Sequence, residues 1–145
     1  MKAINKILFP TDFSDTANNA FRYALWFADK YDATINLLHV VYPEPEPLDV
    51  PVVVAKATQS RIEAAKEVMK ILTENTIAQV QAGHELSQVP EVYSDVKMGM
   101  AGSVISNAAE QKHSDLIIMG THGEHNILER AFGSVTTDTI KNAPC

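Results

Sequence analysis

Three glycines and two hydroxyl side chains follow a short apolar run in the last third of the chain. The run is Leu116–Met119, and the segment behind it reads GTHGEHNILERAFGS from Gly120 to Ser134. Half of the six glycines in the chain stand in this segment, at Gly120, Gly123 and Gly133. Because glycine has no Cβ, a phosphate group can lie directly against its backbone. The segment therefore has the residue types of a phosphate-binding loop.

A helical stretch opens at the end of this loop with Ser134, Val135 and Thr136 and continues toward Ile140. The first turn of a helix has unpaired N–H groups and the positive end of the helix dipole, and both attract an anion. The hydroxyls of Ser134 and Thr136 could donate to the same oxygens. A single glycine more often only turns the chain. Three glycines with a serine at a helix start favour phosphate binding.

The elements that must position this loop alternate between strand and helix patterns. Apolar or β-branched runs predict strands at 7–9, 34–41 and 116–119, and a weaker alternation predicts one at 92–98. Helical spacing of apolar residues predicts helices at 17–28, 62–83, 104–109 and 134–140. We expect the second helix to be interrupted near Asn75 and capped by Gly83. This alternation predicts an α/β fold, with a parallel sheet between helices.

In such a sheet, ligands lie beyond the carboxyl ends of the strands, where the strand order reverses. Three segments are expected there and should be close in space: Pro10-Thr11-Asp12, Val40-Val41 and the loop after Met119. Asp12 is open to several roles. It could contact a ligand, which we favour, act as a general base, or cap the first helix beside Ser14.

The loop differs from the common phosphate-binding motifs. The chain has no G-x4-G-K-[ST] pattern and no G-x-G-x-x-G pattern. A P-loop lysine neutralises charge at the transferring phosphoryl group, whereas this loop has no lysine and contains Glu124 and Glu129 opposed by Arg130. A G-x-S-x-G nucleophile is also absent. Binding is easier to support than rapid hydrolysis, and we assign no catalytic residue.

The histidines and the aromatic residues have simpler interpretations. His84-Glu85 lacks a second histidine four positions on, where Gln88 stands, so no helical metal motif is present there. His39, inside an apolar strand, is better interpreted as a buried residue bonded to backbone than as a catalytic base. Trp26 and Phe27 lie beside the predicted helix face, and we expect them to be packing residues.

Composition limits the class of protein. A chain of 145 residues, 46% hydrophobic and 21% charged, fits one soluble globular domain. A net charge of -6 argues against a nucleic-acid partner, which needs clustered Lys and Arg. No signal-type segment and no run of 18 apolar residues occurs, and the only cysteine is Cys145. We expect a cytoplasmic protein without a membrane partner. The proline-rich and acidic residues 43–51 predict an exposed loop.

The G-x2-G-x9-G-S pattern resembles that of the nucleotide-binding branch of the universal stress protein family. Pro10-Thr11-Asp12 after the first strand and Leu38-His39-Val40 in the second extend the resemblance over nearly the whole chain. The resemblance implies a three-layer α/β/α sandwich, Rossmann-like, of the adenine nucleotide alpha-hydrolase type. It also implies a regulatory stress-response module that binds ATP, or AMP or ADP, with Mg²⁺, and hydrolyses it slowly at most.

The resemblance also assigns the site residues. The phosphates and ribose fall to the loop and helix start, with Met119 and Thr136 at its borders: Gly120, Thr121, His122, Gly123, Gly133, Ser134 and Val135. The adenine and ribose end falls to Pro10, Thr11, Asp12 and Val40. Family members more often have Lys or Arg where Glu124 stands. The alternative is therefore a member that binds no nucleotide and works through protein contacts.

The family usually continues past Ala143-Pro144-Cys145 with a Val-rich fifth strand. We therefore expect a single domain over 1–145 with four strands, ending before that last strand and leaving a neighbouring strand edge bare. In the family the fifth strand commonly pairs with its twin across a dimer axis. A homodimer or a tandem-domain partner is the expected assembly.

Overall fold

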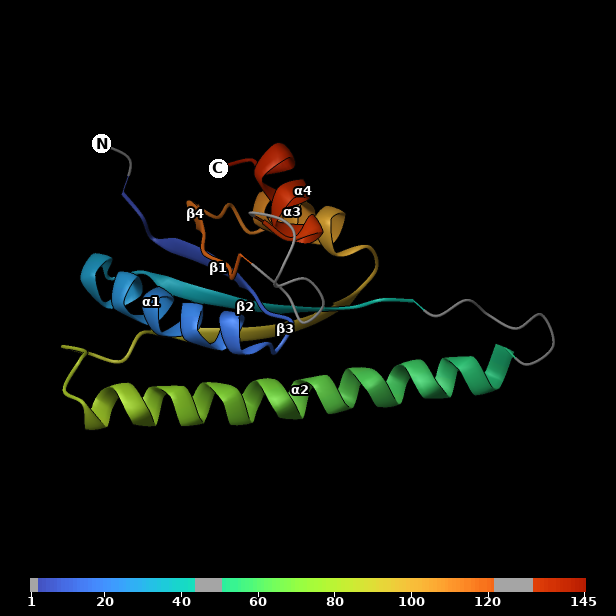
Figure 1. Cartoon of the computed structure of the whole chain (residues 1–145), viewed down its shortest axis with the longest axis horizontal. Coiled ribbons are helices and arrows are strands. Elements are labelled where there is room, and N and C mark those ends of the chain that lie inside the picture. Colours follow the sequence, from blue (N-terminus) through green and yellow to red (C-terminus); the bar gives the residue numbers. More distant parts are fainter. Residues whose placement is uncertain (1–2, 44–50, 122–131) are drawn as a thin grey trace.

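The computed structural model describes residues 3–43, 51–121 and 132–145, with the backbone alone for 51–54. Strands and helices alternate along these ranges (Figure 1). In chain order they are β1 (Lys6–Pro10), α1 (Asp15–Tyr31), β2 (Thr34–Val41), α2 (Pro51–Ala82), β3 (Val92–Met98), α3 (Ala101–Gln111), β4 (Leu116–Ile117) and α4 (Ser134–Asn142). The predicted sequence of elements is confirmed.

The described strands form one four-stranded parallel sheet in the order β3-β2-β1-β4. β1 pairs on both sides, with Ile7 opposite Ile35 of β2 and opposite Leu116 of β4. A strand enclosed in this way needs apolar residues on both faces, and Ile7, Leu8 and Phe9 are fully buried. β4 is shorter than the predicted 116–119, although the N–H of Ile118 still donates to the carbonyl of Leu8 (3.0 Å).

Helices cover both faces of the sheet, as predicted for a three-layer sandwich (Figure 1). Because successive residues of a strand point to opposite faces, β1 divides its side chains between two cores. Ile7 and Phe9 pack with α1 and α2, whereas Leu8 packs with α3 and with Val135 of α4. The strand order reverses between β1 and β4, which is where a ligand is expected.

Helix α2 differs from the prediction in three respects. It begins earlier, at Pro51, which the sequence placed in the exposed loop; the rest of that loop, 44–50, lies outside the described residues. Proline suits a first helical position because its missing N–H has no intrahelical acceptor. The expected interruption near Asn75 is wrong, since α2 runs without a break to Ala82. Asn75 is exposed, while a buried stripe continues past it on the sheet side: Ala65, Met69, Thr76 and Val80.

The end of α2 corrects the predicted cap. The residue in the left-handed conformation is His84 (φ 54°), not Gly83. The N–H of Glu85 donates to the carbonyl of Val80 and the N–H of His84 to that of Gln81, both at 3.0 Å. These two bonds form a Schellman motif, which satisfies the last carbonyls of the helix.

None of the helices in the described ranges is long and apolar enough to cross a bilayer.

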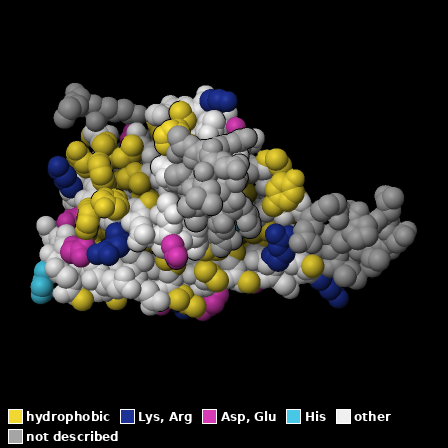
Figure 2. All heavy atoms as spheres, viewed as in Figure 1, with side chains coloured by type: hydrophobic (Ala, Val, Ile, Leu, Met, Phe, Trp, Pro, Cys, Tyr) yellow, Lys and Arg dark blue, Asp and Glu magenta, His cyan; other side chains and the backbone are white. Residues whose placement is uncertain are grey.

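The outer surface of α1 corrects another prediction. Trp26 and Phe27 are not core packing residues, since they are 36% and 42% exposed. They join Tyr23 and Tyr31 in an exposed aromatic row along α1, in which Tyr23 stacks edge-on against Trp26 and Phe27 lies parallel to Tyr31. Figure 2 shows hydrophobic side chains gathered over this helix. The apolar residues of α1 therefore cover more of the helix surface than the part that is buried.

Polar contacts fasten α1 to the segment between α2 and β3. Arg22 donates to both carboxylate oxygens of Glu85 (2.9 and 3.2 Å), and the Trp26 indole N–H donates to the same carboxylate (3.1 Å). Asp29 accepts the backbone N–H groups of Ser87 (2.8 Å) and Gln88 (3.0 Å). The backbone bond from Ser87, and then that from Gln88, lowers the pKa of Asp29 below its ordinary value of 3.8.

We expect this contact of Asp29 to make stability depend on acid. A carboxyl whose pKa is lower in the folded state stabilises that state above its unfolded value, and this stabilisation disappears as the pH falls through the folded pKa. Urea denaturation of the wild type should therefore show a loss between pH 4 and pH 2 that Asp29→Asn reduces. At pH 7 the variant should have the lower urea midpoint, because its amide NH₂ meets a backbone N–H.

Asp32→Asn is the matched control for this prediction. Among the described residues the Asp32 carboxylate accepts only the side-chain amide of Gln88 (3.0 Å), and an asparagine oxygen can do the same. Asparagine also tolerates the left-handed backbone of Asp32 (φ 52°). Equal midpoints for the wild type and Asp29→Asn at both pH values would contradict the prediction.

Candidate functional site

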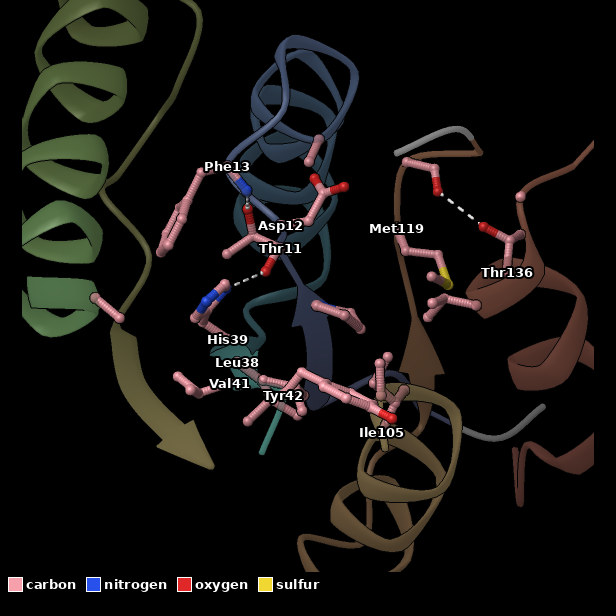
Figure 3. Close-up of a pocket in the computed structure, with 18 of the residues that line it drawn as sticks. Thr11, Asp12, Phe13, Leu38, His39, Val41, Tyr42, Ile105, Met119 and Thr136 are labelled. Atoms are coloured by element: carbon pink, nitrogen blue, oxygen red, sulfur yellow. Dashed lines mark hydrogen bonds between the residues drawn. The ribbon is translucent and has the colours of Figure 1, made fainter. Parts of the chain in front are cut away.

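A cavity of about 840 Å³ lies at the carboxyl ends of β1, β2 and β4 (Figure 3). This volume is within the usual range for small-molecule sites. Described residues from five segments line it: Pro10–Phe13 with Ala17, Leu38–Tyr42, α2 residues Arg61, Ala64, Ala65 and Val68, α3 residues Ala101 and Ile105, and Met119, Gly120 and Gly133–Thr136 around α4. The strand order predicted a site at this edge of the sheet.

The cavity brings together the predicted site residues from all three chain segments. From the strand ends come Pro10, Thr11, Asp12, Val40, Met119 and Gly120; from the start of α4 come Gly133, Ser134, Val135 and Thr136. Thr121 is described but does not line the cavity, whereas His122 and Gly123 lie outside the described residues. Segments separated by more than 100 residues thus meet at one site.

The turn after β1 is fixed by its own hydrogen bonds. The N–H of Thr11 donates to the carbonyl of Leu38 (2.8 Å), which keeps the end of β1 against β2. Asp12 accepts the backbone N–H of Ser14 (3.0 Å), and the hydroxyl oxygen of Ser14 accepts the N–H of Ala17 (3.2 Å). Ser14 is therefore the N-cap of α1. The capping role considered for Asp12 belongs to Ser14, and the exposed Asp12 carboxylate borders the cavity.

His39 holds this turn from the neighbouring strand. Its Nδ1 lies 2.8 Å from the carbonyl oxygen of Thr11, and since a carbonyl only accepts, Nδ1 carries the proton. The imidazole also stacks on Phe13, with ring centroids 4.2 Å apart and planes 23° from parallel. The prediction that His39 bonds to backbone is confirmed, although the side chain is half-buried.

Phe13 is a residue of the site that the sequence did not reveal. Its backbone is left-handed (φ 66°), which is strained for a bulky side chain. The N–H of Phe13 donates to the hydroxyl oxygen of Thr11 (3.1 Å). The stacking on His39 and this bond maintain a conformation that directs the backbone of Thr11 and Asp12. Only a glycine or asparagine would have signalled a left-handed backbone in the sequence.

Gly120 is required by packing against α1. A Cβ on this residue would lie 3.1 Å from the N of Ala17, 3.2 Å from its Cα and 3.3 Å from the carbonyl carbon of Thr16. All three neighbours are backbone atoms in the first turn of α1, so none can rotate away. The absence of a side chain at Gly120 therefore brings the end of β4 against the start of α1, beside the cavity.

Two bonds attach the start of α4 to the segment after β4. The N–H of Gly133, the N-cap of α4, donates to the carbonyl of Thr121 (2.8 Å). The buried hydroxyl of Thr136 donates to the carbonyl of Gly120 (3.1 Å) (Figure 3). The hydroxyl proton of Thr136, which was predicted to bind a phosphate oxygen, therefore holds α4 in position instead. The first N–H groups of α4, which have no intrahelical acceptors, lie at the cavity.

The charges at the cavity are few. Among the described lining residues only Asp12 and Arg61 are ionised, and Arg61 donates to the carbonyl of Tyr42 (3.1 Å). Within the same ranges no three His, Cys, Asp or Glu side chains are grouped as metal ligands. The remaining wall is mostly apolar. An anion at this site would depend on backbone N–H groups and the dipole of α4.

The sequence profile of the universal stress protein family matches residues 3–145. This chain belongs to that family. Among curated relatives, Universal stress protein MJ0577 of Methanocaldococcus jannaschii is 33% identical over 144 residues, which cover 95% of this chain and 89% of the relative. The similarity to this relative therefore extends over most of both chains.

Solved universal stress proteins have the same fold. UspA from Lactobacillus plantarum superposes with a TM-score of 0.84 at 25% identity, covering 100% of this chain and 96% of that one. The solved MJ0577 structure gives 0.78 at 28% identity, covering 99% and 92%. A universal stress protein in complex with cAMP shares the fold, with a TM-score of 0.65 at 15% identity and coverage of 99% and 93%.

Proposed function

We propose that this universal stress protein binds ATP or a related adenine nucleotide and acts as a regulatory stress-response module. The observation that carries the proposal is the position of α4. Its N-terminus, with Gly133 as cap, opens onto a cavity between the carboxyl ends of parallel strands. Such a helix start offers N–H donors and a positive dipole to a phosphate. The solved cAMP complex of another family member supports nucleotides as the ligand class.

The cavity suggests how the nucleotide would lie. The phosphates would contact Gly133, Ser134 and the first N–H groups of α4, together with the sequence-predicted Gly123 and His122. The ribose and adenine would extend toward the strand ends, where Val40 offers an apolar contact and the Asp12 carboxylate can accept a ribose hydroxyl. Figure 3 shows Thr136 of α4 on one side of Met119 and Thr11 and Asp12 on the other, which agrees with separate phosphate and ribose ends.

Mg²⁺ fits this arrangement only as a companion of the phosphates. Asp12 is the single carboxylate among the described lining residues. Mg²⁺ commonly takes phosphate oxygens and several waters besides one or two carboxylates, and with Asp12 at the ribose the phosphates and waters would hold it. The ion would neutralise phosphate charge, which the loop does not do because it contains two glutamates and only one arginine. We infer that the protein binds nucleotide and hydrolyses it slowly at most. We also infer that it lies in the cytoplasm. A dimer stays a prediction.

Nucleotide release and calorimetry test the proposal. Protein purified from cells, washed and then denatured should release adenine nucleotide detectable by chromatography. The nucleotide-free protein should bind ATP with Mg²⁺ in calorimetric titration, with CTP as the control for the base. A folded protein that shows neither release nor heat with ATP, AMP or ADP would contradict it.

The alternative is a family member that acts through protein contacts without nucleotide. The exposed aromatic row of α1 favours it, since Tyr23, Trp26, Phe27 and Tyr31 form an apolar surface of the kind found at protein interfaces. Glu124 in the loop also favours it, because a carboxylate there repels phosphate. Unchanged thermal stability in millimolar ATP and Mg²⁺, with a folded sample, would select this alternative.

A further inference from the structure

The cavity extends to both faces of the sheet. Because strand residues alternate, Leu38 and Val40 of β2 point toward α3 and α4, whereas His39 and Val41 point toward α1 and α2. All four nevertheless line the same cavity. The space therefore passes around the end of β2 and has two parts. We call the part on the α2 side, walled by Phe13, His39, Val41, Ala64, Ala65 and Val68, the α2 lobe.

The α2 lobe differs chemically from the rest of the cavity. Its wall consists of an aromatic pair, Phe13 on His39, facing aliphatic side chains of α2. The glycines and the start of α4 that suit phosphate lie on the opposite side of the strand ends. In Figure 3, Phe13 and His39 lie toward α2, and Met119 and Thr136 lie away from it, with Thr11 and Asp12 between them. An apolar ring fits the α2 lobe, and a phosphate does not.

The polar groups of the lobe agree with this assignment. The Nδ1 proton of His39 is already donated to the carbonyl of Thr11, so the imidazole presents mainly its stacked ring and Nε2. The Arg61 guanidinium, at the edge of the lobe, is bonded to the carbonyl of Tyr42. The three α2 side chains on the lobe side, Ala64, Ala65 and Val68, are all apolar. A flat ring can therefore enter without leaving a buried donor unpaired.

We propose that the α2 lobe binds a flat apolar ring attached to the base of the bound nucleotide. This inference rests on the proposed function, since it takes the phosphates to lie at α4. With the phosphates there, the base would lie at Thr11 and Val40, next to the α2 lobe, because His39 and Val41 of that lobe are the neighbours of Val40 in β2. Burial of a ring in an apolar site of this kind gives about a tenfold gain in affinity when part of the ring stays exposed.

N6-benzyl-ATP and ATP, both with Mg²⁺, test the proposal by calorimetric titration. The wild type should bind N6-benzyl-ATP about tenfold more tightly than ATP. Ala64→Trp should remove this preference, because the enlarged side chain fills the lobe, and the readout is the ratio of the two affinities measured in the same variant. Ala78→Trp is the matched control, since Ala78 is exposed on α2 and does not line the cavity.

The outcomes separate this proposal from the proposed function. Equal or weaker binding of N6-benzyl-ATP, with normal ATP binding, overturns the ring site alone. No binding of either nucleotide overturns the proposed function as well. Benzyl alcohol serves as the free ring: if it binds the ATP-saturated protein while N6-benzyl-ATP has no advantage, the lobe belongs to a separate small molecule and the attached form is overturned. A preference that survives in Ala64→Trp would place the ring outside the α2 lobe.

Discussion

Gly133→Val is expected to abolish nucleotide binding while the protein stays folded. Gly133 is the N-cap of α4 and lines the cavity, so a branched side chain there occupies the space in which a phosphate would meet the helix start. Its backbone (φ -65°, ψ 162°) is extended and suits β-branched residues. Calorimetric titration with ATP and Mg²⁺ should show an affinity loss of at least about a hundredfold.

Ala143→Val is the matched control for this effect. Ala143 flanks the other end of α4 in a similar extended conformation (φ -63°, ψ 135°) and does not line the cavity. It should leave ATP binding unchanged. Thermal denaturation should give similar transitions for both variants and the wild type. If Gly133→Val bound ATP with normal affinity, the start of α4 would not be part of the phosphate site.

Gly120→Val is expected to destabilise the whole fold. The first added carbon already lies 3.1–3.3 Å from three backbone atoms of α1, and valine adds two further methyl groups at this crowded position. Overpacking of this kind costs about 1–3 kcal/mol, and we expect a loss near 3 kcal/mol for Val and near 1 kcal/mol for Ala. The measurement is the free energy of unfolding from urea denaturation.

Gly133→Val serves as the reference for the stability of Gly120→Val. Both substitutions exchange glycine for valine beside one cavity, and at Gly120 the first added carbon lies 3.1–3.3 Å from backbone atoms of α1. The expected order of stability is wild type with Gly133→Val, then Gly120→Ala, then Gly120→Val. Equal unfolding free energies across this series would show that α1 moves away from β4 at little cost.

Periodicity predicted the layers of this fold well because burial repeats along each element. The strand at 34–41 lies where its β-branched, apolar run placed it, and the apolar positions of α1 include the buried Phe21 and Leu25. Two of the errors in α2 concern polar residues. Asn75 is a poor helix former that faces solvent, and His84 takes the left-handed conformation beside a glycine. Tertiary contacts decide both cases.

The candidate site was predictable at the strand ends and not at its α2 wall. Parallel strands and their order place Thr11, Asp12 and Val40 beside Gly120 by topology alone. Ala64 and Val68 lie at helical spacing, which indicates a helix but does not distinguish residues that line a cavity from residues that pack against the sheet. Phe13 has no sequence signal either, because its left-handed backbone depends on His39 from another strand.

The bonds at the start of α4 affect how easily the chain between β4 and α4 can vary in length during evolution. The N–H of Gly133 donates to the carbonyl of Thr121, so two residues twelve positions apart in the chain are joined by a backbone hydrogen bond. Lengthening such a closed loop costs little, about 0.6 kcal/mol for each doubling. The sheet and α4 keep their geometry through Gly120 and Thr136. We therefore expect insertions between Thr121 and Gly133 to change ligand preference at little cost to the folding of the domain.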